Sequence, residues 1–202
     1  MINKDTLLFG SFSNNPGNNG CKYFNNRFRE ENINAIYKSY YSDNIKNSFE
    51  AAKTLGFSGF AVSMPFKFEI VDLVDSVDNA VSDINAANTV IFVDGEAIAY
   101  NTDWIAAAVY LEKINIKKLT ILGNGGFSKA IQYACNKIQI DFEIITRKNW
   151  NKISNIENHI FNATPSEVKV KNIIDGRPHT HQGKEISKLQ AEEQYKLYSK
   201  LF

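Results

Sequence analysis

A glycine turn in the second half of the chain constrains its fold most strongly. From Lys118 the sequence Lys-Leu-Thr-Ile-Leu-Gly-Asn-Gly-Gly-Phe-Ser-Lys-Ala passes from an apolar strand through glycines into a helix. Such a junction can present backbone N–H groups and a positive helix end to a pyrophosphate. Gly123 would make the tight turn, Gly125 would let the backbone approach the phosphates, and Gly126 would let the helix pack closely. The G-x-G-G-x-x-x-A spacing is not the commonest nucleotide pattern, so a strand–helix junction without a ligand explains it equally well.

Strand-like and helix-like segments alternate on both sides of this turn. The expected strands are Thr6–Phe12, Ala35–Tyr40, Gly59–Met64, Thr89–Val93, Ala97–Tyr100, Leu119–Leu122, Phe142–Thr146 and Ile160–Thr164, with a hairpin turn at Asp94-Gly95. The expected helices are Lys22–Glu31, Asp43–Leu55, a helix from near Phe66, one from Asp103 to Lys113, Ser128–Lys137 and Glu185–Leu201. This alternation predicts an α/β fold.

Composition narrows the classes of partner. The chain has 202 residues, 44% of them hydrophobic, which suits one large or two small domains with real cores. The formal net charge of +1 predicts neither nucleic acid nor an anionic membrane as partner. No apolar run reaches membrane-spanning length and no signal-peptide pattern opens the sequence, so we expect a cytoplasmic protein. The spacing of Cys21 and Cys135, and the isolation of His179 and His181 from other ligands, predict no disulfide and no metal site.

Polar residues lie next to predicted strands at three places, where open α/β sheets bind ligands. In V-S-M-P-F-K, Lys67 follows a buried strand and a proline. A lysine held in a cleft acts as a general acid, whereas a lysine at a helix start is simply solvated. In N-A-A-N-T, Asn88 precedes a strand, and a plain turn also explains that sequence. In Y-N-T-D-W, Asp103 begins a helix, and an ordinary N-cap also explains it.

The order of these motifs resembles that of the shikimate dehydrogenase family. The family carries Ser-x-Ser, V-T-x-P-x-K, A-x-N-T, N-T-D, the G-x-G-G-x-x-x-A turn, a basic N-R-T-like loop, N-A-T and a late G-x-x-x-x-x-x-Q-A. The matching residues are Ser11–Ser13, Val62–Lys67, Ala87–Thr89, Asn101–Asp103, Gly123–Gly126, Thr146–Lys148, Asn162–Thr164 and Gly183 with Gln190-Ala191. The resemblance covers nearly the whole length and is nearest to the shikimate dehydrogenase-like subclass.

The resemblance implies reversible reduction of 3-dehydroshikimate to shikimate with NADPH, a step of aromatic amino acid biosynthesis. Lys67 and Asp103 match the catalytic pair, in which the ammonium donates to a carbonyl that becomes an alkoxide and the carboxylate orients the lysine and a ring hydroxyl. The residues that match substrate contacts are Ser11, Ser13, Ser63 (in place of threonine), Asn88 and Gln190. The residues that match cofactor contacts are Gly123, Asn124, Gly125, Gly126, Thr146, Arg147, Lys148, Asn162 and Thr164.

The choice of cofactor also has a local argument. In a dinucleotide fold the residue that ends the second strand meets the adenine ribose, where a carboxylate suits a free hydroxyl and basic groups suit a phosphate. Here that strand ends in Arg147 and Lys148, with no carboxylate close behind. The sequence therefore favours NADP over NAD, although an exposed basic turn also explains these residues.

The chain departs from the family pattern in its second half. Residues between Thr164 and Gly183 are too few for the usual helix and strand, and Asp175–Pro178 is the nearest remnant of a tyrosine and proline segment. We expect a substrate-binding and catalytic domain over residues 1–103, a shortened Rossmann-like NADP-binding domain over 104–185, and a C-terminal helix over 186–202 that packs back on the first domain.

The shortening raises two further expectations. The sheet near Ile160–Ala163 should be covered by a second subunit in a homodimer, by the terminal helix, or by both. The helix residues proposed for this cover are Leu189, Tyr195, Leu197 and Phe202. The alternative to an active enzyme is a reduced, non-catalytic protein that binds a shikimate-like ligand. The choice among shikimate, quinate and aminated relatives stays open.

Overall fold

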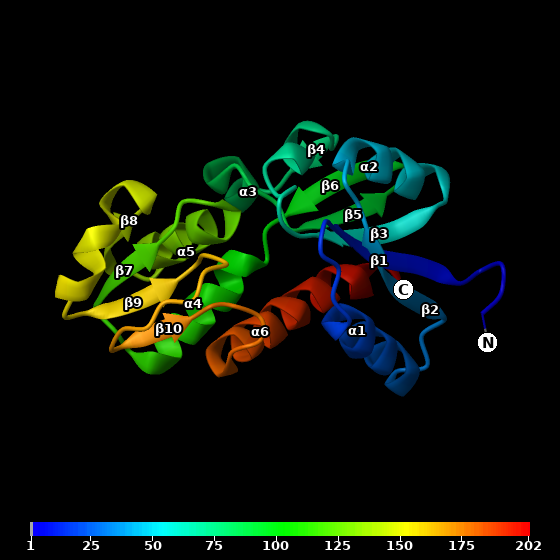
Figure 1. Ribbon diagram of the computed structural model, residues 1–202. Helices are drawn as coiled ribbons and strands as arrows, with labels where there is room; N and C mark the ends of the chain where they lie inside the picture. Colours follow the sequence, from blue (N-terminus) through cyan, green and yellow to red (C-terminus); the bar gives the residue numbers. More distant parts are fainter. Residues whose placement is uncertain (1) are drawn as a thin grey trace. The chain divides into compact units, whose positions relative to one another are not determined.

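The protein, seen in a computed structural model that describes residues 2–202, is an α/β protein with two compact units. The first unit comprises the chain up to Thr102 together with Ala191–Phe202, and the second comprises Asp103–Gln190. Each unit contains its own sheet (Figure 1). The predicted fold class is confirmed.

The first unit is built on a six-stranded sheet of order β2-β1-β3-β5-β6-β4. Its strands are β1 (Leu7–Ser13), β2 (Ala35–Tyr41), β3 (Phe57–Val62), β4 (Ser76–Val77), β5 (Thr89–Val93) and β6 (Glu96–Tyr100). Its helices are α1 (Asn19–Glu30), α2 (Ile45–Thr54) and α3 (Asn79–Ile84), with a 3-10 turn at Glu69–Asp72 and another at Ser199–Leu201. β1 runs parallel to β2 and β3, whereas β5 pairs antiparallel with β3 and β6.

Alternation along β1 divides the core of this unit into two layers. Phe12 belongs to a cluster with Phe49, Phe60 and other residues beside α2. Phe9 belongs to a cluster with Tyr198 and the aromatic residues of α1. Because successive side chains of a strand point to opposite faces, Ser11 and Ser13 lie on the same face as Phe9. That face is aromatic at the start of β1 and polar at its end.

The edge strand β2 is capped by side chains of α1. The Asn25 amide donates to the Tyr37 carbonyl and accepts from the Tyr37 N–H, both at 2.8 Å. One turn earlier, the Cys21 sulfur accepts from the Ser39 N–H at 3.2 Å. Unpaired backbone groups of an edge strand invite association with another chain, so this helix protects the edge.

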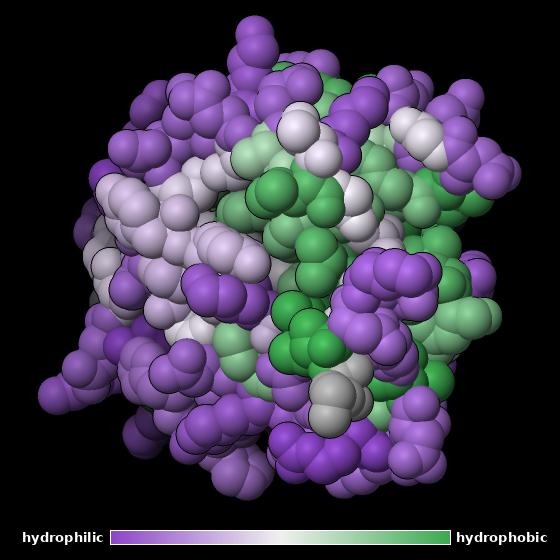
Figure 2. Space-filling view, turned by 90° about the vertical axis from the view of Figure 1, so that its right-hand side faces the viewer, coloured by the Kyte–Doolittle hydropathy of each residue, from purple (hydrophilic) through white to green (hydrophobic). Residues whose placement is uncertain are grey.

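Apolar and polar side chains meet at the surface beside the start of β2. Figure 2 views the protein from the side on which β2 lies in Figure 1 and shows apolar residues there between polar ones. A shallow hollow of about 640 Å³ lies here, and its lining includes the apolar Phe28 and Ile33 and the polar Asn25 and Arg29. It lies against the start of β2, away from the end of the strand where Ser39 pairs with Ser11.

The second unit is built on a four-stranded parallel sheet of order β10-β9-β7-β8. Its strands are β7 (Lys118–Leu122), β8 (Asp141–Ile145), β9 (His159–Asn162) and β10 (Ile173–Asp175). Its helices are α4 (Asp103–Ile114), α5 (Gly126–Lys137) and the first part of α6 (His181–Tyr198), with a 3-10 segment at Arg147–Asn155. The chain passes from β7 to β8 on one side and then to β9 on the other. The strand order therefore reverses at β7, the position where open α/β sheets bind ligands.

The expectation that the segment between Thr164 and Gly183 is too short to supply a strand is wrong. β10 pairs with β9 in parallel, from Ile173 opposite Ile160 to Asp175 opposite Asn162, so the chain itself covers this edge and supplies a short strand. The connection over residues 163–172 contains no helix. Instead Val168 and Val170 pack against the cluster of Leu122, Ile145, Ile153 and Ile160. The sequence alternates these valines with exposed lysines, a pattern that the overall polarity of the segment concealed.

The terminal helix explains the rest of that expectation. Ile186 and the partly buried Leu189 belong to the cluster that contains Phe161, so the helix does cover this face of the second sheet. Tyr195 and Leu197 pack in the first unit instead. The ring centroids of Phe202 and Phe9 lie 6.2 Å apart there. Leu189 and Tyr195 do not share one stripe of α6 because they pack in different hydrophobic clusters.

The other expected strands and helices are present with ends shifted by a few residues, whereas β4, α3 and the 3-10 segment at Arg147–Asn155 were not expected. Asp94 and Gly95 have φ values of 51° and 86°, as a tight hairpin with positive φ requires. The helix expected from Phe66 is wrong: Lys67 lies in a turn, and only a 3-10 turn over Glu69–Asp72 follows. No helix within residues 2–202 has the length and apolar character needed to cross a membrane.

Candidate functional site

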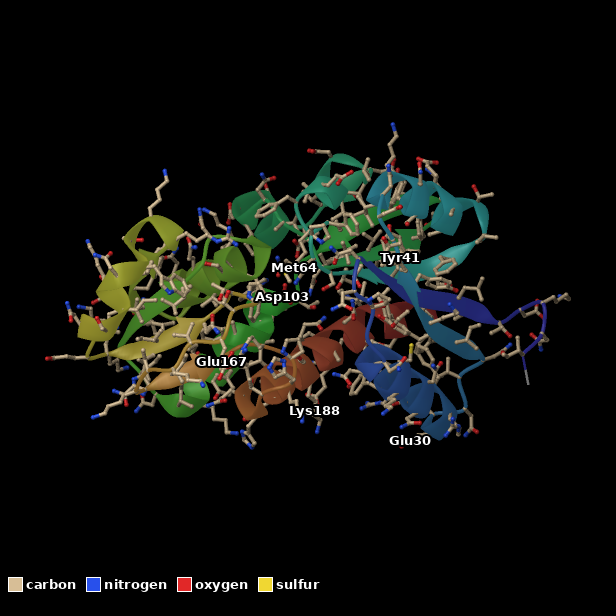
Figure 3. All side chains as sticks on the ribbon, viewed as in Figure 1. Glu30, Tyr41, Met64, Asp103, Glu167 and Lys188 are labelled. Atoms are coloured by element: carbon tan, nitrogen blue, oxygen red, sulfur yellow. The ribbon has the colours of Figure 1, made fainter. Side chains whose placement is uncertain are left out.

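Backbone hydrogen bonds bring several predicted site residues together at the ends of the strands β1 and β3 in the first sheet. The Ser63 N–H donates to the Phe12 carbonyl at 3.1 Å, which joins the end of β3 to the end of β1. The Val62 N–H donates to the Asn88 carbonyl at 2.8 Å, and the Ala87 N–H donates to the Lys67 carbonyl at 2.8 Å. The segments that carry Ser63, Lys67 and Asn88 are thereby fixed beside the end of β1. The intervening Met64 is exposed and is labelled in Figure 3.

The predicted serine pair lies at the end of β1. The Ser11 hydroxyl donates to the Ser39 hydroxyl, on the neighbouring strand, at 3.0 Å. The Cys21 sulfur lies 3.3 Å from the same Ser39 oxygen. Ser13 is buried, and its carbonyl accepts from the Ser42 N–H at 2.9 Å. Both serines are therefore held on rigid backbone, and Ser11 shares a polar cluster with Ser39 and Cys21.

Asn88 is buried in a dense set of hydrogen bonds. Its Oδ1 accepts from the Thr102 N–H at 2.8 Å and from the Thr89 hydroxyl at 3.0 Å. Its Nδ2 donates to the Thr102 Oγ1 at 3.0 Å. Exchanging the amide oxygen and nitrogen would place N–H groups against N–H and O–H donors. The surroundings of Asn88 therefore fix which way its amide faces.

Asp103 and Gln190 belong to the second unit. Asp103 directly follows Thr102, begins α4 and is 6% exposed (Figure 3). A carboxylate in the first turn of a helix is stabilised by the N–H groups and dipole there. Gln190 is partly buried in α6, one helical turn before Gln194. The structure therefore places both side chains on helices rather than on loops.

The glycine turn has the geometry that its sequence predicts. Gly123 has φ of +105°, a conformation that residues other than glycine rarely adopt, and the Thr164 methyl would lie 3.0 Å from an added Cβ. The Ser128 hydroxyl donates to the Gly123 carbonyl at 2.8 Å and closes the turn. At Gly125, which precedes the first residue of α5, an added Cβ would meet nothing within 4 Å and no side chain caps the helix. With the exposed Asn124 beside it, this helix start is open to a ligand.

Basic side chains follow the neighbouring strand β8. Thr146 and Asn149 form a reciprocal capping box at the start of the 3-10 segment, with the Thr146 N–H donating to the Asn149 Oδ1 at 2.8 Å. Arg147 and Lys148 come next and are exposed. The capping box fixes the backbone beneath these two exposed cationic side chains.

Asn162 and Thr164 lie where the chain leaves β9, at the same end of the second sheet as the loops that follow β7 and β8. The Asn162 Oδ1 accepts from the Thr164 hydroxyl at 2.7 Å, and its Nδ2 donates to the Ser166 carbonyl at 2.8 Å. The Ala163 N–H donates to the Leu122 carbonyl at 3.1 Å, so this loop lies beside the glycine turn. Asn162 is fully buried, and its contacts indicate that it shapes the loop.

The sequence did not predict an ion pair beside Asn162. Arg177 donates to both carboxylate oxygens of Asp175, from Nε at 3.1 and 3.0 Å and from Nη2 at 2.7 Å. Burial raises the pKa of the Asp175 carboxyl, but bonds from Arg177 and Asn162 outweigh burial and hold that pKa below its usual range. The strand Ile-Ile-Asp before a Gly-Arg-Pro turn was the available signal for this pair.

The sequence also missed a contact in the first unit. Gln194 is 2% exposed, and its Nε2 donates to the Thr89 hydroxyl at 2.8 Å. Gln194 occupies an otherwise apolar stripe of α6 with Ala191, Tyr195 and Tyr198. A glutamine at a core position of a helix was the signal that could have revealed it.

No group of His, Cys, Asp and Glu side chains in the described part of the chain is arranged to hold a metal ion.

Known proteins are similar to this chain both in sequence and in fold. Residues 20–90 match the family model of the shikimate dehydrogenase substrate binding domain. The shikimate dehydrogenase-like protein of Haemophilus influenzae is 36% identical over 134 residues, which are 65% of this chain and 49% of that protein. The shikimate dehydrogenase (NADP(+)) of Aquifex aeolicus is 36% identical over 144 residues, 68% of this chain and 54% of that protein. The chain belongs to the shikimate dehydrogenase family.

Solved structures of shikimate dehydrogenase family members resemble both units. A shikimate 5-dehydrogenase-like protein superposes with a TM-score of 0.81 at 26% identity, covering 98% of this chain and 93% of that one. A shikimate dehydrogenase in complex with NADP+ superposes with a TM-score of 0.76 at 25% identity, covering 98% and 91%. In sequence, the match spans about half the length of the curated shikimate dehydrogenases and their relatives. The fold of the family is thus present in a chain whose sequence similarity is concentrated in part of it.

Proposed function

We propose that this chain is an NADP-dependent oxidoreductase that reversibly reduces 3-dehydroshikimate, or a close relative, to shikimate. The observation that carries the proposal is the polar end of the first sheet, where the segments of Ser11, Ser13, Ser63, Lys67 and Asn88 meet. Short hydroxyl and amide side chains on rigid strands suit a small ligand with a carboxylate and several ring hydroxyls. Family membership supports the same substrate class.

Each group has a distinct role in the proposed site. The hydroxyls of Ser11 and Ser13 bind the substrate carboxylate. Ser63 and Asn88 bind ring hydroxyls, and Gln190 adds a further amide contact. The Asn88 Oδ1 accepts from Thr102 and Thr89 and its Nδ2 donates to Thr102, so the amide is held in one orientation.

Lys67 and Asp103 form the proposed catalytic pair. As the substrate carbonyl is reduced, its oxygen gains negative charge, and the Lys67 ammonium stabilises that charge and donates a proton. Asp103 orients Lys67 and a neighbouring ring hydroxyl. In the reverse direction Lys67 accepts the proton from the substrate hydroxyl.

The second unit fits the dinucleotide. The uncapped start of α5 and the open space at Gly125 suit a pyrophosphate, whose charge the helix dipole stabilises. Arg147 and Lys148 would hold the adenosine 2′-phosphate, and Thr146, Asn162 and Thr164 shape the adjoining loops. When bound, NADPH supplies a hydride to the carbonyl carbon.

The experiment that tests the proposal is an absorbance assay of NADPH formation from NADP+ and shikimate, with quinate and an aminated shikimate as alternative substrates. We expect turnover of at least one of them, with NADP+ preferred to NAD+. Absence of turnover with all of them in both directions would contradict the proposed enzyme.

A second candidate is a non-catalytic protein that binds a shikimate-like ligand. The four-stranded sheet and the helix-free connection over residues 163–172 favour it, because they reduce the unit that would hold the cofactor. Titration calorimetry separates the two candidates. Shikimate binding without NADPH binding or turnover would support the binder, whereas binding of both ligands with turnover would support the enzyme.

A further inference from the structure

The first turn of α1 has backbone donors without acceptors. The N-cap residue Asn18 makes no side-chain hydrogen bond to this turn, and the turn contains no acidic residue. The first backbone hydrogen bond of the helix runs from the Lys22 N–H to the Asn18 carbonyl at 3.0 Å. Within residues 2–202, the N–H groups of Asn19, Gly20 and Cys21 therefore have no acceptor in the protein. Together with the helix dipole, such groups favour an anion.

The hydroxyl of Ser13 is a further donor without a partner. Ser13 is 7% exposed, and no group within residues 2–202 forms a hydrogen bond with its hydroxyl. A polar group so deeply buried normally has a partner in the protein or in a bound molecule. The hydroxyl of Ser11, by contrast, donates to Ser39 at 3.0 Å. Ser13 is thus the member of the serine pair whose donor is uncommitted.

The register of α1 against β2 brings the helix start to the level of Ser13. The Asn25 amide bonds to the backbone of Tyr37. One turn earlier, the Cys21 sulfur accepts from the Ser39 N–H. Each turn of α1 therefore advances about 6 Å, or two residues, along β2. One turn before Cys21, the N-cap reaches the last residue of β2, which pairs with Ser13.

The side chain of Ser13 also lies on the face of the sheet that α1 covers. Side chains alternate along a strand, so Ser13 shares a face with Phe9. Phe9 packs in one cluster with Phe24 and Phe28 of α1. The buried hydroxyl and the open helix start therefore lie on the same side of the sheet and at the same end of β1.

We propose that the first turn of α1 completes the carboxylate site of the ring substrate. The N–H groups of Asn19 and Gly20 donate to the carboxylate together with the Ser13 hydroxyl, and the helix dipole stabilises its charge. This inference rests on the proposed function, which assigns the carboxylate only to the hydroxyls of Ser11 and Ser13. A carboxylate has about four acceptor positions, more than two hydroxyls fill. The site thereby selects an anionic group over a neutral one.

The test places a negative charge in this turn. Asn19 is exposed, and an acidic residue in the first turn stabilises a helix, so Asn19→Asp should retain the fold. Because the new charge repels the substrate carboxylate, the KM and the calorimetric Kd for shikimate should rise about tenfold. The KM for NADP+ and the Kd for the uncharged shikimate methyl ester should not change. Asn26→Asp, the same charge change on an exposed position further along α1, is the matched control and should resemble the wild type.

Amide NMR detects the contact without turnover. In protein labelled with ¹⁵N-asparagine, the backbone signal of Asn19 is identified by its loss in Asn19→Asp. It should shift on addition of shikimate, and of acetate as the carboxylate alone, relative to chloride at the same ionic strength. The methyl ester should leave it in place, and the Asn26 signal should not move with any of these ligands.

The outcomes separate this inference from the proposed function. An Asn19 signal that bound shikimate does not move, or unchanged shikimate constants in Asn19→Asp, would overturn the inference and leave the proposed function standing. Shikimate binding without turnover would overturn the proposed enzyme, while the Asn19 signal would still decide the carboxylate site. If shikimate does not bind, the proposed function fails. The acetate titration then decides the inference, which a shift of the Asn19 signal supports and an unmoved signal overturns.

Discussion

The ligand contacts proposed for the two units come from different parts of the polypeptide. In the first unit most of the proposed contacts are side chains held by buried hydrogen bonds, as at Asn88 and Thr102. In the second unit they are the backbone of a glycine turn and the exposed side chains of Arg147 and Lys148. Side-chain sites depend on single residues, whereas a helix start and a glycine turn keep their donors through many substitutions. Substitutions should therefore affect the first unit more sharply.

The units also differ in whether helices or extended segments cover their sheets. The first sheet is covered by helices on both faces. In the second, the connection between β9 and β10 covers the sheet with Val168 and Val170 in an extended segment. Alternating apolar residues on an extended segment can replace one side of a helix, because both present a row of side chains to the sheet. A shortened α/β unit can thus keep a closed core.

The largest expected effect tests the side-chain chemistry of the first unit. Lys67→Ala removes the proposed proton donor, and kcat for shikimate oxidation should fall about 100-fold or more while the circular dichroism spectrum is retained. Lys46→Ala, at an exposed lysine of α2, is the control and should leave kcat unchanged. A wild-type kcat in Lys67→Ala would remove this residue from the mechanism.

The next effect concerns a side-chain contact proposed in the second unit. Arg147→Ala should weaken NADPH binding by about 1.5–3 kcal/mol through loss of a charge-assisted hydrogen bond to the 2′-phosphate, with little change for NADH. Calorimetry with both cofactors measures the difference. Lys152→Ala, on the same 3-10 segment, controls for the general loss of charge. Equal weakening for NADPH and NADH would show that Arg147 does not recognise the phosphate.

A third effect tests whether the second unit is stabilised by the ion pair between Arg177 and Asp175. The side chains of Arg177 and Asp175 are 15% and 11% exposed, so Arg177→Ala should lower the free energy of unfolding by about 2 kcal/mol. Because the pKa of Asp175 is lowered in the folded protein, its stabilising effect is present above the unfolded pKa of about 3.9 and is lost as pH falls through the folded pKa. Urea unfolding across this range should show a weaker acid dependence in Arg177→Ala. An identical dependence in both proteins would refute the contribution of the pair.

Local patterns predicted much of the fold. The Asp94-Gly95 hairpin and the glycine turn at Gly123 depend on residues that tolerate positive φ, so their sequence is sufficient to locate them. β10 was missed because Ile173 and Ile174 form a very short apolar run, and its pairing depends on the distant β9. The contact of Gln194 with Thr89 spans two elements far apart in the chain, and no local pattern specifies such a pair. The surroundings of a buried polar side chain depend on tertiary contacts of this kind, so they could not be predicted from the sequence.

The smallest expected effect compares the two sheet edges. β2 is seven residues long and needs the Asn25 clamp, whereas β10 is three residues long and offers little edge to pair. Asn25→Ala leaves the outward N–H and carbonyl of Tyr37 without their protein partner. Since water can replace part of the lost bonding at this partly buried position, the free energy of unfolding should fall by only about 1 kcal/mol. The uncovered edge should also increase self-association in light scattering. Asn26→Ala, at the exposed neighbouring position, is the control. If Asn25→Ala and Asn26→Ala behave alike in both measurements, then the length of β2 and not its clamp sets the behaviour of this edge, and the two edges differ less than their hydrogen bonds indicate.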